Sequence, residues 1–247
     1  MRHTWILLFS LFFFATTTAQ DVEGAWKLTH KNGTEVQDTE YIKIYQDGYF
    51  AFGGKRLEGN EFTDTGGGEY HLEGNHYAEI PDFYTSNPDR IGKKLAYAAD
   101  INGDHMTIKR KDNGDTETWA RIPNQKNDLT GNWVITGRAN PEGEVHQMTP
   151  GDRRTIKILS GGRFQWVAFN SATKEFHGTG GGTYTAENGK YTENITFFSR
   201  DNNRVGASLG FNYEVKDGKW HHSGKSSKGD PIYEIWSKYS EAYTGGK

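Results

Sequence analysis

The chain of 247 residues contains one unusual motif twice, in which three consecutive glycines precede a tyrosine. The first copy reads EFTDTGGGEY at positions 61–70, and the second reads EFHGTGGGTY at positions 175–184. Each glycine inside a regular element costs roughly 0.5–1 kcal/mol relative to alanine, so three in a row are uncommon in globular proteins. Their recurrence in the same context indicates an internal duplication.

Other landmarks repeat in the same order along the chain. Gly24-Ala25-Trp26 matches Gly131-Asn132-Trp133, Tyr77-Ala78-Glu79 matches Tyr191-Thr192-Glu193, and Glu117-Thr118-Trp119 matches Glu234-Ile235-Trp236. The offset grows slowly from 107 to 117 residues, as expected when small loop insertions accumulate in one copy. The sequence therefore predicts two domains.

The domain boundaries follow from these landmarks. The first unit covers residues 21–122 and the second covers residues 131–240. The polar segment 123–130, which begins with a proline, is the expected linker, and it is short enough that the two units should touch. Residues 241–247 are expected to form a flexible tail.

Each unit reads as a series of short strands separated by turn signals. Asn-Gly and Asp-Gly pairs, which favour tight hairpins, occur at 32–33, 47–48, 102–103, 113–114, 188–189 and 217–218. Eight antiparallel strands joined by hairpins can close into an up-and-down barrel, and closure removes exposed sheet edges. We therefore expect an all-β fold of two tandem eight-stranded antiparallel up-and-down barrels, in which residues 86–93 could hold one turn of helix. The triple glycines are expected at the start of a mid-barrel strand.

The first 20 residues have the order of a signal peptide: a charged start, an apolar run from Trp5 to Ala15, and a small-residue cleavage region. The apolar run is shorter than the roughly 20 residues that span a bilayer, so no membrane span is expected. We expect an exported protein, periplasmic or extracellular. With no cysteine, its fold must be held by its core rather than by disulfides.

Composition narrows the class of partner. The formal net charge is −3 with both signs interspersed, which gives no electrostatic support for binding nucleic acid. No phosphate-loop, nucleophile-elbow or zinc-protease motif occurs, and no cofactor is expected. A small molecule or oligosaccharide is the expected partner, and the oligomeric state stays open.

The first and last strands of each unit carry a further pattern. Each unit begins with Gly-x-Trp and ends with a tryptophan followed two residues later by a cation, in Trp119-Ala120-Arg121 and Trp236-Ser237-Lys238. This pattern resembles the lipocalin/calycin superfamily, and the whole chain looks like the tandem lipocalin-like domains of exported Bacteroidota proteins of unknown function. The resemblance implies that Arg121 covers Trp26 and that Lys238 covers Trp133 by cation–π stacking, worth about 0.5–2 kcal/mol. It covers both units, although lysine replaces arginine in the second and the units are shorter than a typical lipocalin.

Glutamates recur among large apolar residues on two strands of each unit. Because side chains alternate along a strand, Tyr77, Glu79 and Phe83 share one face, as do Tyr191 and Glu193 in the second copy. On the last strands, Glu117 and Glu234 share a face with the tryptophans. The candidate ligand-binding residues are Tyr77, Glu79, Phe83, Tyr84, Glu117, Trp166, Tyr191, Glu193 and Glu234. A structural interpretation stays open, in which the glutamates pair with a nearby cation or tyrosine and fix the barrel floor.

Histidines offer a weaker candidate. His71 and His76 flank a tight turn and could join Glu79 in a metal site, but the second unit has threonine and lysine in the matching places. We therefore expect no metal. His221 and His222 point to opposite faces of their strand, cannot chelate together, and are both expected at the surface.

These observations favour a lipocalin-like protein that binds a small or oligomeric ligand, with carbohydrate as the leading class. One alternative is a secreted lyase, isomerase or hydrolase acting on a sugar-like ligand, with Tyr77, Glu79, His76 and Glu193 as candidate catalytic residues. Another is a structural or interaction module whose barrels hold no ligand. Cavity volume separates this last interpretation from the other two.

Overall fold

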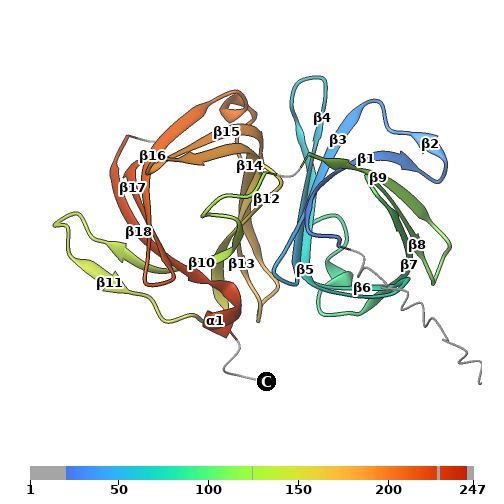
Figure 1. Cartoon of the computed structure of the whole chain (residues 1–247), viewed down its shortest axis with the longest axis horizontal. Coiled ribbons are helices and arrows are strands. Elements are labelled where there is room, and N and C mark those ends of the chain that lie inside the picture. The colour runs from blue at the N-terminus through green and yellow to red at the C-terminus, as the bar shows by residue number, and fades with distance from the viewer. Residues whose placement is uncertain (1–20, 124, 227–228, 244–247) are drawn as a thin grey trace, which may run out of the picture.

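The computed structural model describes residues 21–123, 125–226 and 229–243, and the expected signal peptide at 1–20 lies outside them. The chain forms two closed antiparallel β-barrels that lie side by side (Figure 1). The predicted all-β fold of two eight-stranded barrels is confirmed. Among the described residues, no helix is both long enough and apolar enough to cross a membrane.

The first barrel consists of β1 (Gly24–Lys31), β3 (Thr39–Gln46), β4 (Tyr49–Arg56), β5 (Phe62–Glu73), β6 (His76–Tyr84), β7 (Leu95–Asn102), β8 (His105–Arg110) and β9 (Thr116–Ile122). Consecutive strands pair, and β1 pairs with β9 to close the barrel. The short strand β2 (Thr34–Glu35) adds only to the end of β1. The single helical turn expected in residues 86–93 is the 3₁₀ turn η1 (Pro88–Arg90).

The second barrel repeats this order with β10 (Gly131–Ala139), β12 (Arg153–Ser160), β13 (Arg163–Asn170), β14 (Phe176–Glu187), β15 (Lys190–Phe198), β16 (Ser208–Lys216), β17 (Lys219–Lys225) and β18 (Pro231–Lys238). The closing pair is β10 with β18, and the short β11 (Val145–Gln147) adds to β10 as β2 does to β1. The 3₁₀ turn η2 (Asn202–Arg204) occupies the place of η1.

The C-terminal segment differs from the expected flexible tail. Residues 239–243 form the helix α1 (Tyr239–Tyr243), and residues 244–247 lie outside the described part. The Arg154 guanidinium lies 4.1 Å from the ring centroid of Tyr243, whose ring packs 4.8 Å from that of Tyr239. This aromatic and cationic packing holds the segment against β12.

The triple glycines lie inside β5 and β14 rather than at their start. A β-bulge interrupts the pairing next to them, where Gly68 meets Pro81 while Gly67 meets Phe83. A Cβ atom on Gly68 would lie only 2.0 Å from the Ile80 carbonyl oxygen, and one on Gly182 only 1.9 Å from the Asn194 carbonyl. Glycine is therefore required here because the backbones of neighbouring strands approach too closely for any side chain.

The bulge also changes which face of the sheet the next residues of β6 occupy. The extra residue in β6 turns Phe83 out of its barrel, where its ring packs 5.1 Å from that of Phe169 in the second barrel. The prediction that Phe83 shares the inner face with Tyr77 and Glu79 is therefore wrong. Simple alternation fails at this point because a bulge adds one residue to the two-residue period.

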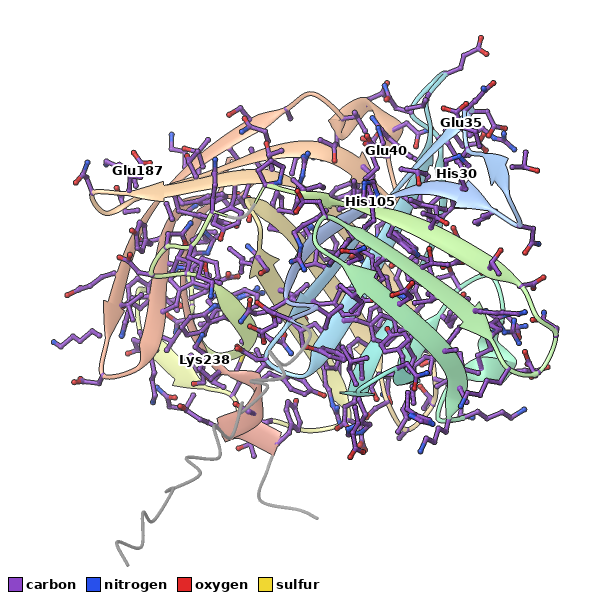
Figure 2. All side chains as sticks on the ribbon, turned by 45° about the vertical axis from the view of Figure 1, so that its right-hand side comes forward. His30, Glu35, Glu40, His105, Glu187 and Lys238 are labelled. Carbon is purple, nitrogen blue, oxygen red and sulfur yellow. The ribbon has the colours of Figure 1, made fainter. Side chains whose placement is uncertain are left out.

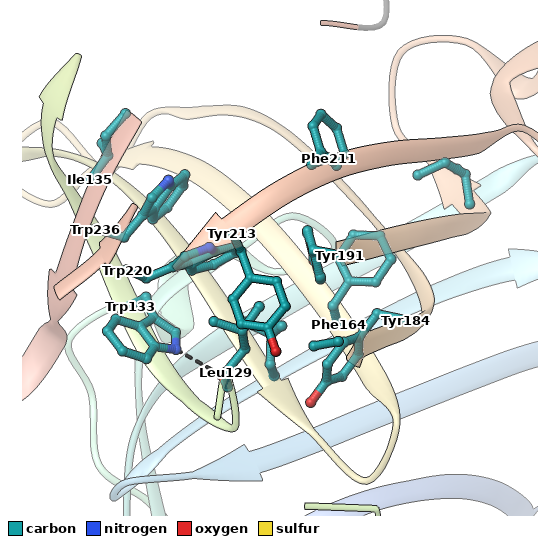
Figure 3. Close-up of a cluster of buried hydrophobic side chains, with 13 residues drawn as sticks. Leu129, Trp133, Ile135, Phe164, Tyr184, Tyr191, Phe211, Tyr213, Trp220 and Trp236 are labelled. Atoms are coloured by element: carbon teal, nitrogen blue, oxygen red, sulfur yellow. Dashed lines mark hydrogen bonds between the residues drawn. The ribbon is translucent and has the colours of Figure 1, made fainter. Parts of the chain in front are cut away.

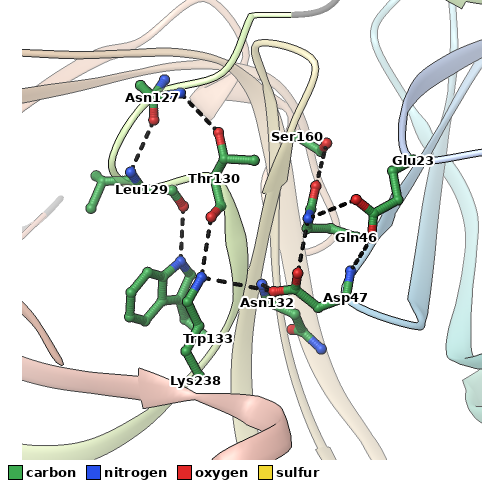
Figure 4. Close-up of polar contacts among 10 residues, drawn as sticks. All are labelled: Glu23, Gln46, Asp47, Asn127, Leu129, Thr130, Asn132, Trp133, Ser160 and Lys238. Carbon is green, nitrogen blue, oxygen red and sulfur yellow. Dashed lines mark hydrogen bonds and ion pairs between the residues drawn. The ribbon is translucent and has the colours of Figure 1, made fainter. Parts of the chain in front are cut away.

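The two barrels share a buried core. Apolar residues of β3 and β4 pack against those of β12 and β13 and include Ile42, Ile44, Ala51, Ile156, Ile158 and Val167. Within this layer the Gln165 side-chain amide donates to Thr65 Oγ1 at 2.9 Å and to Thr179 Oγ1 at 3.1 Å, so that it links both barrels. At the edge, Ser160 Oγ donates to Gln46 Oε1 at 2.7 Å (Figure 4).

Each barrel has a tryptophan at its floor, covered by a cation from the last strand. The guanidinium of Arg121 lies 4.1 Å from the ring centroid of Trp26, and Lys238 Nζ lies 4.0 Å from that of Trp133. This arrangement is the one that the resemblance implies. Lys238 also lies 3.8 Å from the Asp47 carboxylate, so the second floor cation contacts the first barrel (Figure 4). Trp133 belongs to a cluster of buried side chains in the second barrel that includes the rings of Tyr191 and Trp220 (Figure 3).

Candidate functional site: one cavity in each barrel

The first barrel contains a cavity of about 250 Å³, here named cavity 1. Its aromatic walls are Tyr41, Phe52, Tyr84 and Trp119, and its polar walls carry both cations and carboxylates. All of its lining residues belong to the first barrel. Cavity 1 is therefore a site of that barrel alone.

The base of cavity 1 is a buried ion pair between Lys43 and Glu79. Glu79 also accepts hydrogen bonds from Tyr77 at 2.5 Å and from Tyr97 at 3.3 Å, and Tyr45 donates to the Tyr77 hydroxyl at 2.9 Å. Burial opposes the charged ammonium, but the Glu79 carboxylate together with Tyr45, Glu117 and Tyr97 outweighs it, and the pKa of Lys43 lies well above its ordinary value. Burial and the same carboxylate raise the pKa of Tyr77, which stays a hydrogen-bond donor.

The upper wall of cavity 1 holds two further polar groups. Glu117 accepts a hydrogen bond from Trp119 Nε1 at 3.2 Å, and Arg90 in η1 donates to the Tyr84 hydroxyl at 2.8 Å. Glu117 is half-buried and lines the cavity together with Glu79. Cavity 1 thus presents carboxylates, including Glu79 and Glu117, beside aromatic rings.

The second barrel contains a larger cavity of about 460 Å³, named cavity 2. At its base Lys157 Nζ lies 2.6 Å from Glu193 Oε1, which also accepts a hydrogen bond from Tyr191 at 2.8 Å. This Lys–Glu–Tyr arrangement matches Lys43, Glu79 and Tyr77 residue for residue at an offset of 114. The lining residues belong to the second barrel alone, so the two cavities are separate sites.

The wall of cavity 2 differs from that of cavity 1 around Glu234. Its carboxylate accepts hydrogen bonds from Arg138 at 2.5 Å and from Trp236 Nε1 at 3.2 Å, and it lies 3.3 Å from His222 Nδ1. Burial works against the charged carboxylate, but the His222 hydrogen bond and the surrounding cations hold the pKa of Glu234 to about 2. Burial lowers the pKa of His222.

The structure brings most of the candidate residues together in two groups. Glu79, Tyr84 and Glu117 line cavity 1, and Trp166, Glu193 and Glu234 line cavity 2. Tyr77 and Tyr191 are buried directly beneath, bonded to the glutamates of their barrels. Phe83 is the exception, because it packs between the barrels.

Of the candidate histidines, only His222 is buried. His71 and His76 are exposed whereas Glu79 is buried, so these three residues do not form a metal site. His105 is exposed and His30 is half-buried, and both belong to the first barrel (Figure 2). The expectation that His222 lies at the surface is wrong: its side chain is 2 % exposed and lines cavity 2.

The sequence interpretation missed the two buried lysines and His222. Lys43 and Lys157 occur at matching positions within apolar strands, a repeat signal that marks them as partners of the matching glutamates. His222 lies opposite Glu234 in the pairing of β17 with β18, whereas Ile108 lies opposite Glu117 in the first barrel. Only the register of these strands places His222 beside Glu234.

No family model matches the chain, and no curated protein matches it in sequence. The closed eight-stranded barrels fit a lipocalin-like fold.

Proposed function

We propose that the protein is a binding protein with two small-molecule sites, one in each barrel. The observation that carries this proposal is that the barrels are not filled: above each charge-compensated Lys–Glu–Tyr base lies an open cavity with aromatic walls. Concave sites with apolar walls and a few fixed polar groups are typical of small-molecule binding. A module with solidly packed barrels would have no such cavities.

For cavity 1 we propose a carbohydrate-like ligand with several hydroxyl groups. Its walls alternate hydrogen-bonding groups such as Arg90, Arg110 and Glu117 with the rings of Tyr84 and Trp119. Sugar rings offer hydroxyls at their edges and C–H groups on their faces, and such walls match both. The expected export of the chain agrees with a protein that captures a nutrient outside the cytoplasm.

The proposal is tested with the chain from residue 21 onward and a panel of glucose, galactose, mannose and xylose, followed by saturation-transfer NMR. We expect at least one sugar to show transfer, and we expect Thr116→Trp, which fills cavity 1, to abolish it. Ala207→Trp in cavity 2 is the matched control and should leave the sugar signal unchanged. Sugar binding that survives Thr116→Trp, or no binding by any member of the panel, would contradict the assignment of cavity 1.

The presence of Glu79 and Glu117 in one cavity supports an alternative function, hydrolysis or elimination on a sugar-like ligand. Glu79 is held by Lys43, Tyr77 and Tyr97, which suits a structural carboxylate better than a mobile acid or base. Glu117 is the freer of the two, because Trp119 holds only one of its oxygens. Product formation from a bound sugar that disappears in Glu117→Gln while affinity is kept would favour the enzyme.

A further inference from the structure

His222 lies in the wall of cavity 2 among aromatic rings. Its ring centroid is 4.3 Å from that of Phe211, 5.2 Å from that of Trp220 and 5.8 Å from that of Tyr191. Only 2 % of the residue is exposed. The imidazole is therefore fixed in one orientation by packing, with Nδ1 toward Glu234.

The partner of Nδ1 decides where the proton of the imidazole resides. An ionised carboxylate can only accept hydrogen bonds, and Glu234 is held ionised by Arg138 and the other donors around it. Nδ1 of His222 therefore carries the hydrogen and donates it to Glu234. The other ring nitrogen, Nε2, is left with a lone pair that can accept a hydrogen bond.

This second nitrogen has no partner within the described part of the chain. Nε2 of His222 is shielded from solvent and makes no hydrogen bond there. An unpaired buried acceptor costs about 1–3 kcal/mol. The first barrel closes with Ile108 in the matching place, so closure of a barrel does not by itself require a histidine there.

We propose that cavity 2 binds a ligand with a hydroxyl or N–H group, and that Nε2 of His222 accepts a hydrogen bond from it. This inference rests on the proposed binding function and specifies the ligand of its second site. The apolar part of the ligand packs on Trp166, Phe198 and Leu209, which line the same cavity. Because Nε2 is shielded in this structure, the proposal requires a neighbouring side chain such as Phe211, whose ring lies 4.3 Å from that of His222, to shift when the ligand binds.

The test compares 1-naphthol with 1-methoxynaphthalene, two probes that share an aromatic body but differ in the O–H donor. Calorimetric titration of the wild-type protein should give about 10-fold tighter binding of 1-naphthol, the factor that corresponds to one net hydrogen bond to a buried acceptor. His222→Ile, which copies the first barrel, should remove the preference and leave 1-methoxynaphthalene affinity unchanged. Ala207→Trp should block both probes and so assign the binding to cavity 2.

A second measurement uses the wild-type protein and does not depend on a variant that folds. In protein labelled with ¹⁵N-histidine, the Nε2 resonance of His222 should move on addition of 1-naphthol and stay in place with 1-methoxynaphthalene. Equal affinities for the two probes, or an unmoved resonance with 1-naphthol bound, would overturn this inference and leave the proposed binding function intact. Failure of both probes to bind cavity 2 would overturn this inference, while sugar binding in cavity 1 would still support the proposed function there.

Discussion

The two barrels share their bases and differ in their walls. Each base is a buried lysine, glutamate and tyrosine, and each floor is a tryptophan under a cation. The charged walls and bases comprise Lys31, Lys43, Asp64, Glu79, Arg90, Arg110, Asp115 and Glu117 in cavity 1, and Arg138, Lys157, Glu193, Arg200, Arg204 and Glu234 in cavity 2. Charges balance in the first cavity, whereas cations exceed carboxylates in the second.

This difference distinguishes the residues that both barrels share from the residues that differ between the two cavities. Residues kept in both copies satisfy buried charges that the barrel itself requires, because an unpaired buried ion would be costly wherever it occurred. Residues that differ, such as His222 in place of Ile108, are not part of that shared set. We therefore expect substitutions of the shared residues to change stability, and substitutions of the divergent residues to change the proposed ligand binding.

The largest expected effect tests the shared base. Lys43→Met and Lys157→Met each leave a glutamate buried without its cation, and we expect each to lower the free energy of unfolding by about 3–5 kcal/mol. Urea unfolding followed by tryptophan fluorescence measures the loss, and native-state hydrogen exchange assigns it to a barrel. The double variants Lys43→Met/Glu79→Gln and Lys157→Met/Glu193→Gln should recover much of it. A loss below about 1 kcal/mol in one barrel would show that the barrel does not need its buried lysine for stability.

The next effect concerns the wall of cavity 2. The folded pKa of Glu234, about 2, lies below the ordinary value of 4.5, so its ionised form stabilises the fold above about pH 4.5. That stabilisation is lost as pH falls through about 2. We expect the wild type to exceed Glu234→Gln by about 3 kcal/mol in unfolding free energy at pH 7. Urea unfolding at a series of pH values should show this difference in unfolding free energy disappear between about pH 5 and pH 2. A difference that stays constant with pH would contradict the prediction.

The smallest expected effect tests whether close approach of neighbouring strands is the reason for glycine at both bulges. Gly68→Ala and Gly182→Ala place a Cβ atom within 2.0 Å of a carbonyl oxygen on the neighbouring strand, and we expect each to cost about 2 kcal/mol. Gly210→Ala is the control, because a Cβ atom there meets nothing within 4 Å. Thermal unfolding compares the three variants. A loss at Gly210 as large as at Gly68 would show that chain flexibility rather than close approach explains the glycines.

Much of the fold was predictable because its causes are local. The repeated landmarks define two units, and the turn signals are borne out by left-handed residues such as Asn32 and Asp47, each followed by a glycine of positive φ. The buried glutamates were also predictable, because Glu79 and Glu193 recur among large apolar residues of matching strands. Their lysine partners lie 36 residues away in sequence, so only the closed barrel brings them together.

The sequence by itself determined the duplication, the all-β class and the pairs of equivalent residues, since these depend on composition, alternation and turn chemistry along the chain. Tertiary structure decided which side chains face a cavity. One extra residue at the bulge turns Phe83 from the inside of its barrel to the interface, and the register of β17 against β18 places His222 beside Glu234. Both outcomes depend on strand pairing, which is fixed by packing across the whole barrel rather than by any local segment.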